Sequence, residues 1–157
     1  MLSGAMTETE HPETPIDEYV CLALYTASRA VTGLYRELLD ELELTYPQYL
    51  VMRLLWQRGP VPVKDIAATL QLDYGTLSPL LKRLEAAGLL RRTRRPDDER
   101  SVEIALTEAG QAMRAKADNV PTDLLCAMGL SDRTAAQLRA TLERLTASVN
   151  DTARDGP

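Results

Sequence analysis

The sequence predicts a mainly α-helical protein that carries one small β-hairpin. Apolar residues recur at steps of three and four over most of the chain, which is the period of an amphipathic helix. Near residue 100 the period changes, and Val102, Ile104 and Leu106 alternate with polar residues as in a half-buried strand. With 157 residues, of which 45% are hydrophobic, the chain is long enough to bury a core. We therefore expect one domain.

The amino-terminal part is expected to be a tail followed by two helices. Residues 1–15 carry no apolar periodicity and are expected to form a flexible tail. From Ile16 an apolar stripe at helical spacing predicts a first helix of about 25 residues. Thr45 is expected to cap a second helix, which has Pro47 in its first turn and ends at Gly59.

A helix pair and a hairpin are predicted next. The first helix of the pair spans 63–70, and the second is capped by Asp73 and stopped by Gly88. Two short helices joined by a tight turn form a helix-turn-helix, whose second helix can enter the major groove of DNA. Strands over 89–94 and 101–106 then flank a polar hairpin tip.

The carboxy-terminal part is predicted to be helical again. Thr107 is expected to cap one helix, and Ser131 to start the last one. The expected organisation is a winged helix between two helical arms. Its parts are a single domain over 16–157, a winged helix-turn-helix over 45–106, and arms over 16–44 and 107–151.

Composition excludes several classes of protein. The single histidine, His11, lies in the expected tail, so we expect neither a histidine-based metal site nor a Ser-His or Cys-His catalytic pair. We also expect no cofactor. Two cysteines are too few for a disulfide framework, and a reducing cytoplasm keeps them as thiols. The sequence contains no apolar run of the ~18 residues that a membrane span needs. We expect a cytoplasmic protein without a membrane partner.

The net charge of -5 hides an uneven distribution. Residues 1–50 hold nine acidic and two basic side chains, whereas six basic residues between 82 and 95 face one acidic residue, Glu85. Such a block is often a solvated surface, but after a helix-turn-helix it favours contact with DNA phosphates. The six basic residues are Lys82, Arg83, Arg91, Arg92, Arg94 and Arg95.

A resemblance to the MarR family of dimeric bacterial repressors is carried by three segments: LTYPQYLVMRLLW, GTLSPLLKRLEAAGLL and DDERSVEIALTEAG. The segment CLALYTASRAVTGLYRELLDELELTYPQYL is more specific, because it resembles the branch of that family that senses organic hydroperoxides. Together the resemblance spans about Val20 to Val149. It implies a homodimer held by the amino- and carboxy-terminal helices, bound to double-stranded DNA at an inverted-repeat operator.

The predicted DNA contacts lie on the second helix of the pair and on the wing. The start of that helix is expected nearest the base edges, and its later basic residues near the phosphates. By the family's wing motif, Arg100 would enter a minor groove and Asp98 would orient its guanidinium through a bidentate pair. The family usually has a small residue at the position of Tyr74 in this chain. The remaining predicted contacts are Thr76, Ser78, Pro79, Lys82, Arg83, Arg94 and Arg95.

The candidate sensing residue is Cys21, one turn into the first predicted helix. A helix amino terminus favours the thiolate, which attacks peroxides to give a sulfenic acid and then a disulfide with a second thiol. The alternative is that Cys21 is simply a small buried hydrophobic residue. Tyr25 lies four residues on and can sit beside it, whereas Tyr35 lies roughly 21 Å farther along a straight helix.

The resemblance assigns further roles in sensing. It implies that tyrosines matching Tyr35 and Tyr46 donate hydrogen bonds to the reactive thiolate from the partner subunit. It also implies that Cys126 resolves the sulfenic acid of Cys21 through an intersubunit disulfide. The alternative for both tyrosines is core or interface packing.

Two other functions stay open from the sequence. A repressor of this kind can instead be released by a small phenolic or anionic ligand, which would make both cysteines incidental. A thiol peroxidase could use Cys21 and Cys126, although it would have no use for a basic helix-turn-helix and wing.

Overall fold

The computed structural model describes residues 14–154. It is mainly helical with one small antiparallel sheet, as the sequence predicts. Apart from Thr14 and Pro15, the expected tail over 1–15 lies outside the described residues, and so does His11. The elements are η1 (Ile16–Glu18), α1 (Val20–Leu38), η2 (Asp40–Leu42), α2 (Tyr46–Arg58), β1 (Val61–Pro62), α3 (Val63–Leu70), α4 (Tyr74–Ala86), β2 (Leu90–Arg95), β3 (Asp98–Leu106), α5 (Glu108–Ala117), α6 (Val120–Ala127) and α7 (Asp132–Arg154).

Helix α2 contributes more buried side chains to the core than any other element, and it begins and ends where the sequence predicts. The Thr45 hydroxyl accepts a hydrogen bond from the Gln48 backbone N–H, and the Gln48 side chain accepts one from the Thr45 N–H, which together form a capping box. Gly59 ends the helix at a φ of 75°, a conformation that favours glycine. The fully buried Met52 and Leu55 of α2 belong to the same core as the helix pair α3 and α4.

The sheet has the order β1-β3-β2, and all of its pairs are antiparallel. The ladder of β2 and β3 continues out to the pair Arg95 and Asp98, so the hairpin tip is shorter than the polar run over 95–100 suggests. Charged residues can extend a ladder when their side chains point into solvent. The polar character of residues 95–100 therefore made the predicted strands stop short of the hairpin tip. Strand β1, two residues long, was not predicted from the sequence.

Two predicted helices divide in the structure. The first does not begin at Ile16: the turn η1 comes first, Tyr19 is extended with φ -72° and ψ 123°, and α1 begins at Val20. The apolar stripe crosses this break because Ile16 and Val20 are four residues apart. The helix after Thr107 divides into α5 and α6, so Cys126 lies on α6 and not on a continuous fifth helix.

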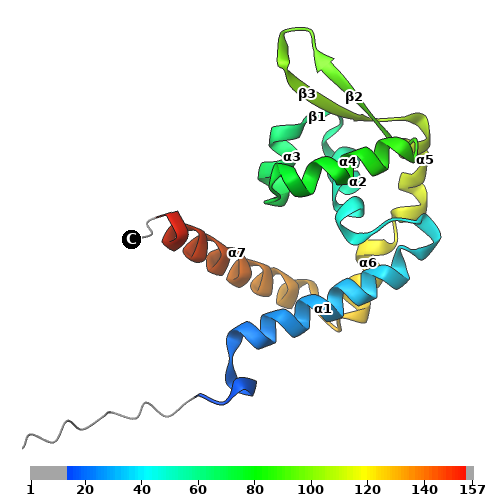
Figure 1. Ribbon diagram of the computed structural model, residues 1–157. Helices are drawn as coiled ribbons and strands as arrows, with labels where there is room; N and C mark the ends of the chain where they lie inside the picture. Colours follow the sequence, from blue (N-terminus) through cyan, green and yellow to red (C-terminus); the bar gives the residue numbers. More distant parts are fainter. Residues whose placement is uncertain (1–13, 155–157) are drawn as a thin grey trace, which may run out of the picture.

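Helices α1 and α7 form arms that extend away from the winged part, on the opposite side from the β2–β3 hairpin (Figure 1). None of the residues of α7 is buried in the single chain. Its apolar stripe is instead partly open to solvent, at Leu138, Leu142, Leu145 and Val149. Within residues 14–154, the helices lack the combination of length and apolar character that crossing a membrane requires.

Candidate functional site

The start of α4 is fixed by Asp73, which caps the helix as predicted. One carboxylate oxygen accepts the Thr76 backbone N–H at 2.8 Å, and the other accepts the Thr76 hydroxyl at 2.9 Å. These two hydrogen bonds hold the pKa of Asp73 below its ordinary value. Because the Thr76 hydroxyl hydrogen is used within the chain, this exposed side chain can offer an outside partner only an acceptor and a methyl group.

A groove of about 370 Å³ lies between the start of α4 and the wing. Tyr74 and Ser78 line it from the helix, and Asp98 and Arg100 line it from β3. Tyr74 is 60% exposed, so its ring stands free at the first position of the helix. The structure thus brings predicted residues of the helix and of the wing to one surface. The other predicted helix residues, Pro79, Lys82 and Arg83, are exposed on α4.

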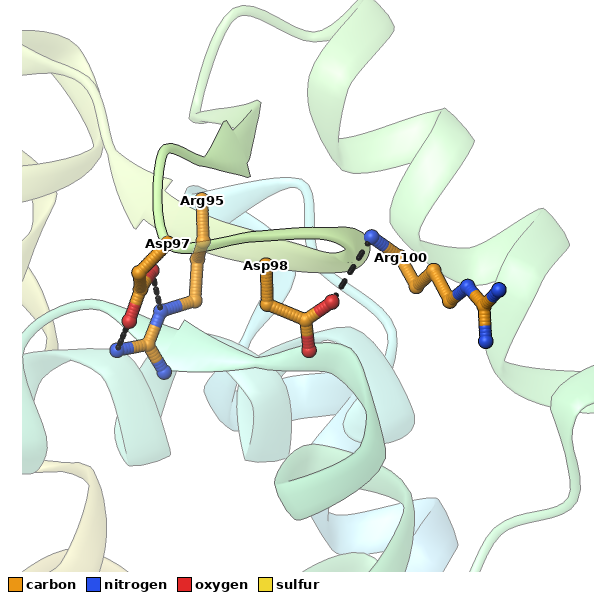
Figure 2. Close-up of polar contacts among 4 residues, drawn as sticks. All are labelled: Arg95, Asp97, Asp98 and Arg100. Carbon is orange, nitrogen blue, oxygen red and sulfur yellow. Dashed lines mark hydrogen bonds and ion pairs between the residues drawn. The ribbon is translucent and has the colours of Figure 1, made fainter.

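The wing tip differs from the expected arrangement, as Figure 2 shows. The Asp98 carboxylate accepts the backbone N–H of Arg100 at 3.1 Å, and the Arg100 guanidinium points away from it. The expected bidentate pair of these two side chains is therefore wrong for this structure, because Asp98 holds the turn of the chain instead. The bidentate pair at the tip joins Arg95 and Asp97, at 3.2 and 3.1 Å. Arg94 is exposed.

The prediction of DNA contacts did not single out Arg92, which lies at the foot of the wing. Its Nε atom is 3.2 Å from a carboxylate oxygen of Glu85, and its Nη2 atom donates to the Ser78 carbonyl at 3.5 Å. Both partners belong to α4. Strand alternation could have indicated this, since Arg92 lies two residues after the buried Leu90 and therefore on the same face.

The two cysteines are exposed free thiols on different helices. Cys21 is the second residue of α1, and α1 continues unbroken to Leu38. Next to it on the helix, Tyr25 accepts a hydrogen bond from Arg29 at 3.2 Å, and the Arg29 guanidinium lies 5.5 Å from the centre of the Tyr25 ring. Cys126 lies near the end of α6, and α6 contacts α1 within the chain.

Tyr35 and Tyr46 form a stacked pair, with ring centres 3.9 Å apart and planes inclined by 16°. Burial raises the pKa of Tyr35 well above its ordinary value, and the neighbouring Tyr46 and Tyr49 raise it further. Burial also raises the pKa of Tyr46 and of Tyr49. These phenols therefore stay protonated at neutral pH, and each hydroxyl keeps its hydrogen.

An open cavity of about 1310 Å³, lined largely by α7, lies beside Tyr46 of this pair. Tyr46 forms part of its wall, and α6 contributes Leu124, Leu125 and Met128, which surround Cys126 in the sequence. Leu142 of α7 lies on the same cavity. This largely apolar space is therefore lined by Tyr46, by apolar side chains of α6 and by α7, and neither Tyr35 nor Cys126 is among its lining residues.

Sequence comparison gives consistent relatives. Residues 44–102 match the model of the MarR family. The chain is 40% identical over 143 residues to the organic hydroperoxide resistance transcriptional regulator of Bacillus subtilis, covering 91% of this chain and 97% of the relative. It is 44% identical over 147 residues to the HTH-type transcriptional regulator TtmR of Methylorubrum extorquens, covering 94% of this chain and 73% of the relative.

Structural comparison points to the same family. Reduced AbfR bound to DNA superposes with a TM-score of 0.70 at 30% identity, over 82% of this chain and 91% of that one. AbfR with its disulfide formed superposes with a TM-score of 0.61 at 32% identity, over 80% and 88%. The relatives named above are regulators of transcription and not enzymes. With their similarity extending over nearly the whole chain, the protein belongs to the MarR family of DNA-binding transcriptional regulators.

Proposed function

We propose that the protein is a cytoplasmic, homodimeric repressor that senses organic hydroperoxides through Cys21. In this proposal Cys126 is the resolving thiol, and Tyr35 and Tyr46 of one subunit donate hydrogen bonds to the Cys21 thiolate of the other. The observation that carries it is the stacked pair of Tyr35 and Tyr46, whose second member lines a cavity together with apolar residues of α6, the helix that carries Cys126. The B. subtilis relative, named for organic hydroperoxide resistance, supports the class of signal.

The site needs two subunits because of the geometry of α1. Cys21 and Tyr35 are fourteen residues apart on one unbroken helix, which separates them by roughly 21 Å. A hydrogen bond between them within one chain is impossible. The exposed stripes on α1 and α7, including Val20 and Leu145, offer apolar surface for a second copy of the chain.

The proposed oxidation needs no reactant other than the hydroperoxide and the two thiols. The Cys21 thiolate attacks the terminal oxygen of the hydroperoxide, the O–O bond breaks, and the alkoxide leaves and takes up a proton to give an alcohol. The sulfenic acid then condenses with the Cys126 thiol of the partner, forming a disulfide and releasing water. Apolar residues near Cys21 in the sequence, such as Leu22, Leu24 and Tyr25, would favour hydroperoxides with organic substituents over hydrogen peroxide.

Oxidation would change DNA binding because it changes the same interface that sets the spacing of the two α4 helices. In the reduced dimer, each α4 enters a major groove and each wing a minor groove of an inverted-repeat operator. A disulfide between Cys21 and Cys126 would displace α6 relative to α1 and move the two helices out of operator spacing.

The test is a DNA-binding titration at fixed salt, on the DNA upstream of the protein's own gene, before and after one equivalent of cumene hydroperoxide. We expect peroxide to release the wild-type protein and to leave Cys21→Ser bound. Cys126→Ser is the matched control, since it should form the sulfenic acid without the intersubunit disulfide seen on a non-reducing gel. Hydrogen peroxide in place of cumene hydroperoxide should react more slowly.

Two outcomes would reject the proposal. If Cys21→Ser is released as readily as the wild type, the thiol is not the sensor, and a small ligand in the cavity beside Tyr46 becomes the better explanation. If Tyr35→Phe with Tyr46→Phe leaves the rate of Cys21 oxidation unchanged, the tyrosines serve packing alone.

A further inference from the structure

We infer that Arg92 is a positioning residue for DNA binding, which fixes the wing to the recognition helix α4 and does not itself bind phosphate. The Arg92 bridge, meaning its contacts to Glu85 and to the Ser78 carbonyl, joins β2 to two points on α4. Ser78 and Glu85 are seven residues apart, so the guanidinium contacts groups that belong to two different turns of the helix. The inference concerns DNA binding alone and does not depend on Cys21 chemistry.

The place of Arg92 in the sheet explains why a bridge is needed there. Arg92 pairs with Ile104, and Ile104 is also where β1 joins β3. Beyond the Thr93–Glu103 pair the wing is a two-stranded ribbon, with an irregular register between Arg94 and Arg95. Because a two-stranded ribbon is only marginally stable by itself, its direction must be set within the short three-stranded part, which consists of the levels of Arg92 and Thr93.

The surroundings of Arg92 differ from those of an arginine free to bind DNA. Its Nε atom is shielded from solvent and has no aligned hydrogen-bond acceptor, so the Glu85 carboxylate at 3.2 Å compensates it as an ion pair. The Arg92 side chain is 29% exposed and that of Glu85 43%, and Arg92 lies at the groove between α4 and the wing. Taking Glu85 away would leave a shielded polar group uncompensated, which is more costly than losing a solvent-exposed pair.

The wing holds a natural comparison in the pair of Arg95 and Asp97. This pair has the same charges and a similar distance of 3.1 Å, but it lies at the tip and its side chains are 41% and 67% exposed. Arg95 can therefore leave Asp97 for a phosphate, whereas Arg92 cannot leave Glu85 without releasing the wing. The two acidic residues should have opposite effects on DNA affinity.

The experiment neutralises each acid in turn and measures affinity and its salt dependence on a duplex that the wild-type protein enriches from random-sequence DNA. Asp97→Asn should bind about two- to threefold more tightly, with the slope of log K against log salt steeper by up to about 0.9, because Arg95 gains a phosphate. Glu85→Gln should bind about five- to tenfold more weakly, although it removes a negative charge beside DNA.

Variants of Arg92 separate positioning from phosphate binding. Arg92→Gln should weaken binding as much as Glu85→Gln, and the double variant should be no weaker than either, since both remove one bridge. Arg92→Lys should fail to restore affinity, because an ammonium group cannot span Glu85 and the Ser78 carbonyl together. A phosphate contact would be largely retained by lysine.

A second readout needs no DNA. Hydrogen exchange of the β2–β3 amides near Thr93 should accelerate in Glu85→Gln and stay unchanged in Asp97→Asn, while circular dichroism confirms that both variants fold. The inference is overturned if Glu85→Gln strengthens DNA binding, if Arg92→Lys retains wild-type affinity, or if wing exchange is unaffected by loss of the bridge.

Discussion

Gly110 of α5 packs directly against the backbone of Leu89, the residue before β2, and its replacement by alanine tests this packing. A Cβ atom at this position would lie 2.0 Å from the Leu89 carbonyl oxygen and 3.0 Å from its carbon. These are backbone atoms next to β2, so the clash can be relieved only by moving the helix or the strand. The Gly110 carbonyl also accepts the buried Trp56 indole N–H at 2.9 Å.

The expected cost follows from these contacts. Overpacking a core costs about 1–3 kcal/mol, and a shift of α5 that pulls the residue 110 carbonyl away from the Trp56 indole N–H adds up to about 1–3 kcal/mol. Alanine returns up to about 1 kcal/mol through its better helix propensity. The free energy of unfolding of Gly110→Ala should therefore fall by roughly 3 kcal/mol, a large part of the stability of a typical domain.

Urea unfolding followed by far-UV circular dichroism measures this change in the free energy of unfolding. The protein concentration must be held fixed, because a dimer unfolds in a concentration-dependent way. Ala112→Gly, at an exposed position of the same helix, is the control for propensity and should cost about 1 kcal/mol. A Gly110→Ala protein as stable as the wild type, or more so, would show that propensity outweighs the contact with Leu89 and would refute the reasoning.

Three further predictions concern ionisation and assembly. Burial raises the pKa of Tyr35 in the folded state above its value in the unfolded state. The stability that its neutral form contributes is therefore complete below about pH 10 and is lost as the pH rises through the folded-state pKa. In urea titrations at alkaline pH, Tyr35→Phe should lose less of its free energy of unfolding than the wild type. The pH dependence from Asp73 has the opposite sign, because its pKa is lowered in the folded state: its contribution to stability is complete above about pH 3.8 and is lost as the pH falls through the lowered pKa. Asp73→Asn should remove this dependence of stability on acid pH while keeping the helix cap. Leu145→Asp, on the open stripe of α7, should give a folded monomer by sedimentation whose Cys21 reacts more slowly with cumene hydroperoxide, and an unchanged rate would argue against a site shared between subunits.

The sequence predicted most of the winged part because local signals there agree with the packing. Thr45, Asp73 and Thr107 each accept the backbone hydrogen bond expected of a cap, and the helix over 63–70 has the bounds that its spacing indicated. Caps and periodicity are properties of a few neighbouring residues, so one sequence is enough to find them. The break at Tyr19 was not predicted, because Ile16 and Val20 on either side of it are four residues apart and so keep the helical spacing of apolar residues.

The residues that depend on tertiary contacts were harder to foresee. Nothing in the run LLRRTRR distinguishes Arg92 from its neighbours except strand alternation, and the acid that pairs with it lies on α4. The same holds at the tip, where the sequence allowed Asp98 to face a side chain and the structure gives it a backbone N–H. Which acid meets which arginine is set by sheet register and turn geometry, and composition does not encode either one directly.

The proposed switch depends on the rigidity of α1, because this one helix connects both ends of the sensing site. At one end it carries the exposed Cys21, and at the other Tyr35 is buried in the core. In the dimer that we propose, a displacement of about 2 Å at the thiol would turn a rigid rod of roughly 21 Å by about 5°. A flexible linker in place of α1 would absorb such a displacement. An unbroken helix instead passes it to the domain that carries α4 and the wing, so that covalent chemistry at an exposed thiol can alter the spacing of DNA-binding elements that it never contacts.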